Sequence, residues 1–188
     1  MTKKPLVLQV NILPLVVFFL VSTASNTAVT TKHNELSAAD LDKQLVQSRK
    51  ERINALKGFF SDAKSPLKAN AETFVDIADK YNLDYKLLPA IACMESSCAK
   101  KLIEGSFNPF GWGIYGNNAI YFKSYDEAIE TVAKGIREKY VDKGLTTPEK
   151  IAPVYTPPNY VNWRNGVTYF MNKIDSYKGV ESEVTFSS

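Results

Sequence analysis

The spacing of apolar residues along the chain predicts a mainly α protein. In five stretches apolar residues recur at every third or fourth position, which places them along one face of a helix. These stretches are residues 37–60, 71–81, 84–96, 124–140 and 159–177. Thr147-Pro148 has the sequence of an N-cap and first helical position, so a short helix is expected at 147–155.

Local signals place the starts of these helices. Ser37, Asp84 and Ser124 are side chains that cap helices, and Ser124 with Glu127 has the spacing of a capping box. Pro89 follows soon after Asp84 and removes one backbone donor. The start of the helix at 84–96 is therefore expected to be irregular or tightened towards 3₁₀ geometry.

The first 24 residues have the layout of an export signal. Lys3 and Lys4 precede an apolar run at 12–21, and small residues at 22–24 offer a cleavage site. Polar residues just before this run keep it shorter than the ~20 residues of a membrane-spanning helix. We expect a secreted, periplasmic or cell-wall-associated protein, with membrane attachment only if the signal stays uncleaved.

The rest of the chain divides into three expected parts. Residues 25–65 fit a linker and an accessory amphipathic helix, 66–178 one compact domain, and 179–188 a flexible tail. The helix at 37–60 also suits a stalk, a partner-binding helix or a first domain helix. With 188 residues, of which 45% are hydrophobic, the chain can bury one core but hardly two.

Charge and histidine content exclude several functions. The net charge of +3 and the scattered basic residues argue against a nucleic-acid partner, whereas a mild positive excess suits an anionic cell wall or membrane surface. The only histidine, His33, lies in the linker, which excludes Ser-His and Cys-His catalysis and a multi-histidine metal site. We expect a monomer that uses no cofactor and no metal.

One carboxylate stands where a core side chain is expected. Leu88, Ile91 and Ala92 form the apolar face of the helix at 84–96, and Glu95 follows Ile91 by four residues. Burial there disfavours the ionised form, so Glu95 can keep and donate a proton near neutral pH. A glycosidase requires this chemistry of its general acid. The alternative is a solvated glutamate near a helix end.

A dense aromatic segment follows this helix. Residues 104–118 mix glycine, asparagine and aromatic side chains too closely for a regular element. Such a segment can place rings and amides along a sugar-binding cleft, or simply close the core. Gly116-Asn117-Asn118 followed by residues 119–122 also predicts the turn and return strand of a small β-hairpin. A hairpin and an irregular loop therefore both remain open.

Two cysteines flank the candidate acid. Cys93 and Cys98 are too far apart for a disulfide on a continuous helix, so a bond requires the helix to end near Ser96. Two small buried thiols are the alternative.

These motifs together resemble the lysozyme-like superfamily. The segments that carry the likeness are Asp84–Ser96, Asn108–Gly111, Phe122–Ile129, Val154-Tyr155 and Asn159-Tyr160. Within the superfamily, the sequence is most similar to the mannosyl-glycoprotein endo-β-N-acetylglucosaminidase-like (glucosaminidase) domains and to the soluble lytic transglycosylases. The resemblance implies a lysozyme-like helical fold for the compact domain.

The resemblance also implies roles for individual residues between about 68 and 176. Glu95 would protonate the glycosidic oxygen of a peptidoglycan strand. Tyr155 would stabilise the oxocarbenium-like state or position a nucleophile, although it equally suits core packing. The implied sugar contacts are Ser96, Asn108, Phe110, Trp112, Tyr115, Tyr121 and Tyr160.

One departure from the family pattern bears on the mechanism. Residues 112–124 contain no carboxylate, whereas a two-carboxylate hydrolase needs a base or nucleophile across the sugar from the acid. This absence favours attack by the substrate's own hydroxyl or acetamido group. The nearest acids are Glu104, Asp126, Glu127 and Glu130. A glucosaminidase-like hydrolase, a lytic transglycosylase and a non-catalytic wall-binding protein therefore all remain open.

Overall fold

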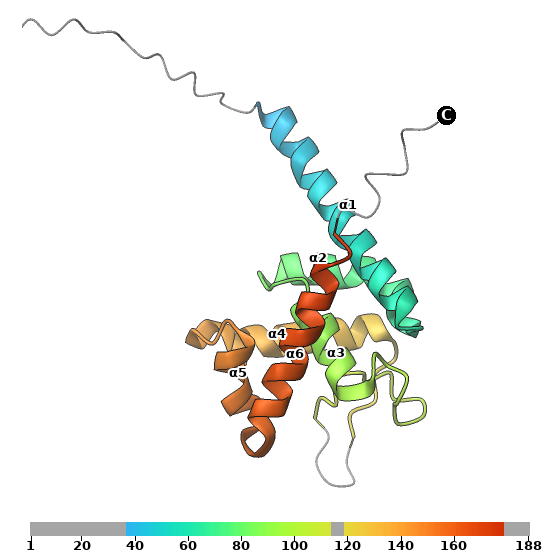
Figure 1. Cartoon of the computed structure of the whole chain (residues 1–188), viewed down its shortest axis with the longest axis vertical. Helices are drawn as coiled ribbons and strands as arrows, with labels where there is room; N and C mark the ends of the chain where they lie inside the picture. Colours follow the sequence, from blue (N-terminus) through green and yellow to red (C-terminus); the bar gives the residue numbers. More distant parts are fainter. Residues whose placement is uncertain (1–36, 114–118, 179–188) are drawn as a thin grey trace, which may run out of the picture. The chain divides into compact units, whose positions relative to one another are not determined.

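The computed structural model describes residues 37–113 and 119–178 (Figure 1). These residues form six α-helices and three short 3₁₀ helices, with no β-strand among them, so the mainly α prediction is confirmed. The α-helices are α1 (Ala38–Asp62), α2 (Ala71–Lys80), α3 (Leu87–Ser96), α4 (Tyr125–Lys139), α5 (Pro148–Tyr155) and α6 (Tyr160–Asp175). The 3₁₀ helices are η1 (Pro66–Asn70), η2 (Val141–Lys143) and η3 (Pro157–Asn159).

Several predicted features lie outside the described residues. They are the export signal at 1–24, the linker up to 36 with His33, the site residue Tyr115, the hairpin turn at 116–118 and the tail at 179–188. Within the ranges that the structure does describe, no helix combines the length and apolar composition needed to cross a membrane.

A single apolar core includes half of α1. Leu56, Phe59 and Phe60 on this helix are fully buried, and the Phe60 ring lies 5.6 Å from the ring of Phe74 in α2. Earlier in α1, Leu45 is 59% exposed. The boundary expected at residue 65 therefore falls inside one core, because the buried face of α1 packs with the helices that follow it.

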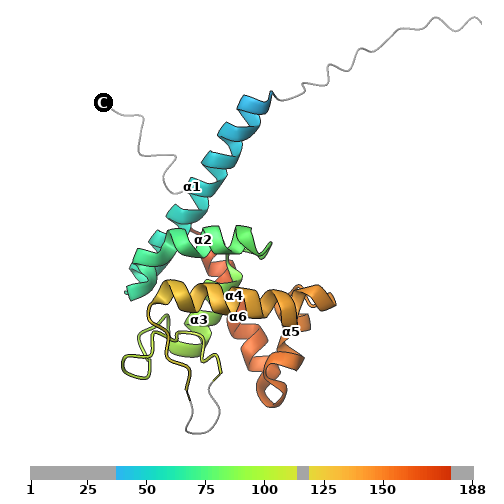
Figure 2. The same ribbon diagram turned by 180° about the vertical axis from the view of Figure 1, so that it is seen from behind.

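Ion pairs link α1 to α2 at the surface. Arg49 of α1 pairs with Glu72 at 2.5 Å and with Asp76 at 2.7 Å, and Arg52 pairs with Asp79 at 2.5 Å. These groups are partly or largely exposed to solvent, so each pair adds little stability. On its other side α2 lies beside α4, as Figure 2 shows.

Helix α3 begins later than its sequence signals suggest. Asp84 does not cap the helix directly, because its side chain accepts a hydrogen bond from the Lys86 amide at 2.9 Å in the turn before Leu87. Pro89 then falls in the first turn of α3, where backbone N–H groups lack intrahelical partners in any case. The irregularity expected from Pro89 is thus confined to the preceding turn.

The C-terminal end of α3 is sharp. Ser97, Cys98 and Ala99 all have left-handed backbone angles, with φ of 53°, 60° and 62°, so the helix stops at Ser96. The reversal brings Cys98 back to Cys93, and the two form a disulfide. The helix end that a disulfide requires is therefore present.

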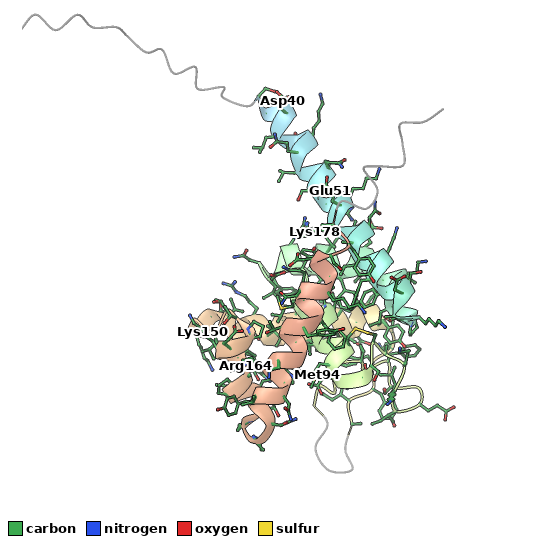
Figure 3. The ribbon with its side chains drawn as sticks, in the orientation of Figure 1. Asp40, Glu51, Met94, Lys150, Arg164 and Lys178 are labelled. Atoms are coloured by element: carbon green, nitrogen blue, oxygen red, sulfur yellow. A yellow bond between two sulfur atoms is a disulfide. The ribbon has the colours of Figure 1, made fainter. Side chains whose placement is uncertain are left out.

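Helices α3 and α6 run antiparallel in close contact (Figure 3). Lys86 at the start of α3 pairs with Asp175 at the end of α6 at 2.7 Å. Near the other end, a β-carbon on Gly166 would lie only 2.2 Å from the Met94 sulfur. The absence of a side chain at Gly166 lets the middle of α6 approach Met94, the residue before Glu95.

Helix α4 begins with a modified capping box. The Ser124 hydroxyl accepts a hydrogen bond from the Glu127 amide at 3.2 Å, as the sequence predicts. The Glu127 carboxylate does not return to Ser124, however, and accepts instead from the Lys123 amide at 2.6 Å. The amides of Lys123 and Glu127 at the helix entrance are both satisfied in this arrangement.

The return strand expected at 119–122 is wrong, and an irregular loop takes its place. The Phe122 amide bonds back to the loop, to the Ser106 carbonyl at 2.8 Å. The Ile120 carbonyl accepts from the Asn108 side chain at 3.1 Å, which removes an acceptor that a β-ladder would use.

Candidate functional site

Glu95 lies in the last turn of α3 and faces the start of α6. The Trp163 indole Nε1 donates a hydrogen bond to Glu95 Oε1 at 2.8 Å. The Glu95 residue is exposed overall, yet burial of its carboxyl among protein atoms raises the pKa. The indole hydrogen bond acts in the opposite direction, because it favours the charged form. Glu95 is thus a solvent-accessible acid that holds its proton more tightly than an ordinary glutamate.

The two carboxyl oxygens of Glu95 have different surroundings. Oε1 is engaged by the Trp163 indole. Oε2 faces Gly111, where a β-carbon would lie 3.7 Å away, and Gly111 has a left-handed φ of 60° that favours glycine. In the neutral acid, Oε2 is therefore the oxygen placed to carry the proton.

Tyr155 lies next to two tryptophans, Trp163 and Trp112. Its ring stacks on Trp163 with centroids 4.7 Å apart, and it lies 6.4 Å from the Trp112 ring. The Tyr155 hydroxyl donates a hydrogen bond to the Phe110 carbonyl at 3.3 Å. α5, α6 and the loop before α4 thus meet around one aromatic cluster beside Glu95.

A cleft of about 370 Å³ opens next to this cluster. It shares Gly111 with the surroundings of Glu95 and Tyr155 with the aromatic cluster. Its lining residues are Gly111, Trp112, Gly113, Ile120, Lys139, Tyr140 and Tyr155. Aromatic rings together with a cation suit a polar ligand that has flat apolar faces, as a sugar has.

Helix α4 seats the Trp112 ring in the wall of this cleft. A β-carbon on Gly135 would lie 2.4 Å from Trp112 Cζ2, so only glycine leaves room for the ring there. One turn later on the same helix, Lys139 Nζ lies 4.9 Å from the Trp112 ring centroid. The position of the ring therefore depends on the absence of a side chain at residue 135.

Three of the expected sugar contacts lie inside the protein. Phe110 is fully buried and meets Phe74 edge-on at 6.5 Å. The Ser96 hydroxyl is shared among the backbone groups of Ala92, Pro109 and Ala99 at 2.8 to 2.9 Å.

Asn108 is the third of these buried residues, and it is 4% exposed. Its side chain bonds the carbonyls of Trp112 and Ile120 and accepts from the Trp112 amide at 3.1 Å. Ser96, Asn108 and Phe110 thus position the loop, and a ligand in the cleft would not touch them directly.

The remaining expected contacts divide between the cleft and the open surface. Trp112 and Tyr155 line the cleft. Tyr121 and Tyr160 are 60% and 43% exposed, and neither contributes to the cleft wall. Tyr115 lies outside the described residues.

The sequence pattern does not predict two residues of the site, Trp163 and Lys139. Trp163 lies in the helical stretch predicted at 159–177, and a buried indole N–H needs an acceptor, but Glu95 is 68 positions away in the chain. Lys139 gives no signal at all, because lysine near the end of a helix is ordinary.

The other acids near the site serve structural roles. Asp126 accepts hydrogen bonds from Asn70 and Thr73 at 2.8 and 2.7 Å, and Glu130 pairs with Lys80. Glu127 is engaged at the entrance of α4. Of the four candidates for a second carboxylate, Glu104 alone remains, exposed in the loop.

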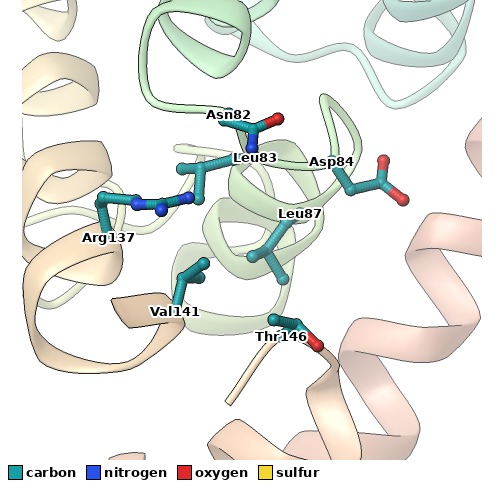
Figure 4. Close-up of a pocket in the computed structure, with 7 residues that line it drawn as sticks. All are labelled: Asn82, Leu83, Asp84, Leu87, Arg137, Val141 and Thr146. Atoms are coloured by element: carbon teal, nitrogen blue, oxygen red, sulfur yellow. The ribbon is translucent and has the colours of Figure 1, made fainter. Parts of the chain in front are cut away.

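A second hollow of about 410 Å³ lies near the start of α3 (Figure 4). Glu95 is at the other end of this helix. Its charged side chains are already paired within the protein. Arg137 bonds Asp142 at 2.8 Å, and Asp84 lies 3.7 Å from Lys86. The cleft beside Glu95 is therefore the stronger candidate for a functional site.

A scan of protein families finds none that matches this sequence, and a search of characterised proteins finds no significant relative.

Proposed function

We propose that this protein is an exported enzyme that cleaves the glycan strands of peptidoglycan, with Glu95 as its general acid. The observation that carries the proposal is the solvent-accessible Glu95 carboxyl with a raised pKa, held by Trp163 beside an aromatic cleft. The motif resemblance to lysozyme-like glucosaminidases and lytic transglycosylases supports the same reading. The proposed fold is accordingly a lysozyme-like arrangement of the compact helical domain.

The proposed reaction begins with proton transfer from Glu95 Oε2 to the glycosidic oxygen. The bond between that oxygen and the anomeric carbon breaks, the leaving sugar keeps the proton, and positive charge develops on the anomeric carbon. The resulting Glu95 carboxylate accepts the Trp163 hydrogen bond more strongly than the neutral acid does. Trp163 therefore stabilises the acid in the form that the transfer produces.

The second half of the reaction needs a nucleophile from outside the protein. Asp126, Glu127 and Glu130 are engaged in structural contacts, and Glu104 is not among the described residues that line the cleft, so the substrate's own groups are the proposed source. Attack by a ring hydroxyl gives an anhydro sugar, whereas attack by the acetamido oxygen followed by water gives a reducing end. In either case the Glu95 carboxylate takes back the proton that the attacking hydroxyl or water loses.

Tyr155 is proposed to position the acid. Its hydroxyl already donates to the Phe110 carbonyl, and its ring holds Trp163 against Glu95. Together with Trp112 it offers ring faces to a sugar in the cleft.

Digestion of purified peptidoglycan tests the proposal. Glu95→Gln keeps the shape and can still accept the indole hydrogen bond but has no acidic proton, so we expect release of soluble fragments to fall by about 10²- to 10⁴-fold. Glu51→Gln, which removes an exposed carboxyl on α1 away from the cleft, is the matched control and should digest like the unaltered protein. Equal digestion by the Glu95→Gln protein would refute the assignment of the acid.

Analysis of the products distinguishes a lytic transglycosylase from a hydrolase and from a non-catalytic protein. Mass spectrometry of the fragments distinguishes an anhydro end from a reducing end, and the sugar at that end identifies the bond cleaved. A wall-binding protein without activity is the second candidate, favoured by the lack of a free second carboxylate other than Glu104 among the four acids. It predicts that the unaltered protein sediments with peptidoglycan and releases nothing.

A further inference from the structure

Lys139 places a positive charge in the wall of the cleft. Its ammonium lies 4.9 Å from the Trp112 ring centroid, and Lys139 is one of the residues that line the hollow. Among the described residues, Lys80, Lys86, Lys134 and Lys178 pair with carboxylates, but Lys139 does not. Residues 114–118, which complete the neighbouring loop in the sequence, contain no acid.

The backbone of α4 sets this charge beside the ring. Gly135 admits the Trp112 ring against the helix, and Lys139 follows one turn later on the same face. A sugar that packs beside Trp112 therefore lies next to an ammonium group with three hydrogen-bond donors. A hydroxyl of a neutral sugar can accept a hydrogen bond from this group, whereas a carboxylate accepts the hydrogen bond and also pairs its negative charge with the ammonium.

We propose that Lys139 makes the cleft selective for glycans that carry a carboxylate on or next to the sugar at Trp112. This inference rests on the proposed function and names the part of the substrate that Lys139 recognises. In peptidoglycan the carboxylate has two sources. One is the lactyl ether of muramic acid, which is free in strands without peptides, and the other is the stem peptide attached to that ether.

Three glycans separate the sources in a binding experiment. They are neutral chitooligosaccharides, peptide-free peptidoglycan strands and peptide-bearing strands. Affinities are measured by titration calorimetry in the full chain carrying Glu95→Gln, so that the glycans are not cut. Lys139→Met is added to remove the charge, and Lys134→Met, on the same helix and 60% exposed, is the matched control.

We expect Lys139→Met to weaken binding of carboxylate-bearing strands by about two- to fivefold at low salt, the range of an exposed ion pair. Binding of the neutral oligosaccharides should not change. The loss should shrink at high ionic strength, because salt screens the charge. Lys139→Arg should restore most of the affinity. Loss confined to peptide-free strands assigns the lactyl carboxylate, and loss confined to peptide-bearing strands assigns the stem peptide.

The proposal is overturned if Lys139→Met weakens all three glycans equally, since the lysine would then only support the Trp112 ring. It is equally overturned if no glycan distinguishes Lys139→Met from Lys134→Met, or if none of the three binds. Failure of the proposed function gives a different result, namely a protein that binds glycans but whose digestion of peptidoglycan is absent or indifferent to Glu95→Gln.

Discussion

The carboxyl of Glu95 is subject to two opposing influences. Removal from water raises its pKa, and the Trp163 indole partly offsets this by bonding to the charged form. A general acid works only while protonated, so activity should fall as the pH rises through the raised pKa of Glu95. The Trp163 hydrogen bond to Oε1 therefore lowers the pH above which activity is lost.

Trp163→Phe should move that upper limit to higher pH. The substitution removes the hydrogen bond that favours the carboxylate, so the pKa of Glu95 rises further and the acid stays protonated longer. The measurement is kcat/KM against pH on peptidoglycan, below the unfolding temperature of the variant. Tyr169→Phe, at an exposed position of the same helix, should leave the profile unchanged. A limit that stays fixed or moves to lower pH in Trp163→Phe would contradict the assignment of Glu95.

At this scale the sequence predicts the place of Glu95 in its helix but not its surroundings. The helical register places Glu95 at the end of the stripe formed by Leu88 and Ile91, and both of those residues are buried. Trp163 cannot be chosen as the partner of Glu95 from spacing, since the contact depends on how α3 and α6 pack. Phe110 is expected as a sugar contact but is buried in the core. An aromatic residue in a glycine-rich loop fits a sugar site and a core equally well, so the sequence does not distinguish the two.

Single elements are most predictable where their signals are local. Ser37 and Ser124 cap α1 and α4 as expected, because a cap involves residues only three positions apart. The strand at 119–122 fails because the side chain of Asn108, twelve residues earlier than Ile120, takes the carbonyl that a strand partner would need. Such a long-range hydrogen bond leaves no mark in the alternation of residues.

Gly135→Ala tests the way α4 seats Trp112. Alanine favours the helix by up to about 1 kcal/mol over glycine, yet its β-carbon would collide with the Trp112 ring and displace it. We expect glycan affinity to fall by about two- to tenfold, the range of one aromatic contact. The readouts are titration calorimetry and Tm. Thr131→Ala, on the exposed side of α4, gains helix propensity without touching the ring. Unchanged affinity in Gly135→Ala would exclude Trp112 from the site.

For the molecule as a whole, the sequence predicts the helical class but misplaces the edge of the core. The amphipathic pattern extends along the whole of α1, but only the C-terminal half of this helix is buried. The pattern alone therefore does not show where packing begins. Leu45 and Leu56 both belong to the predicted apolar face, but the first is 59% exposed and the second is fully buried. The difference depends on where α2 crosses α1.

These two leucines give a matched test of the core boundary. Leu56→Ala should lower the free energy of unfolding by about 2–5 kcal/mol, because it leaves a cavity among buried rings. Leu45→Ala should change it by less than about 0.5 kcal/mol. Urea denaturation followed by circular dichroism measures both. Similar losses in the two variants would mean that the exposed half of α1 is also packed in solution.

The location of the two tryptophans has a practical consequence. Trp112 and Trp163 are the only indoles in the chain, and one lines the cleft while the other touches the acid. Intrinsic fluorescence excited selectively in the indole band therefore originates entirely from the candidate site. Emission from the unlabelled protein can report ligand entry there without background from the rest of the fold, and single replacement of either residue would divide the signal between cleft and acid.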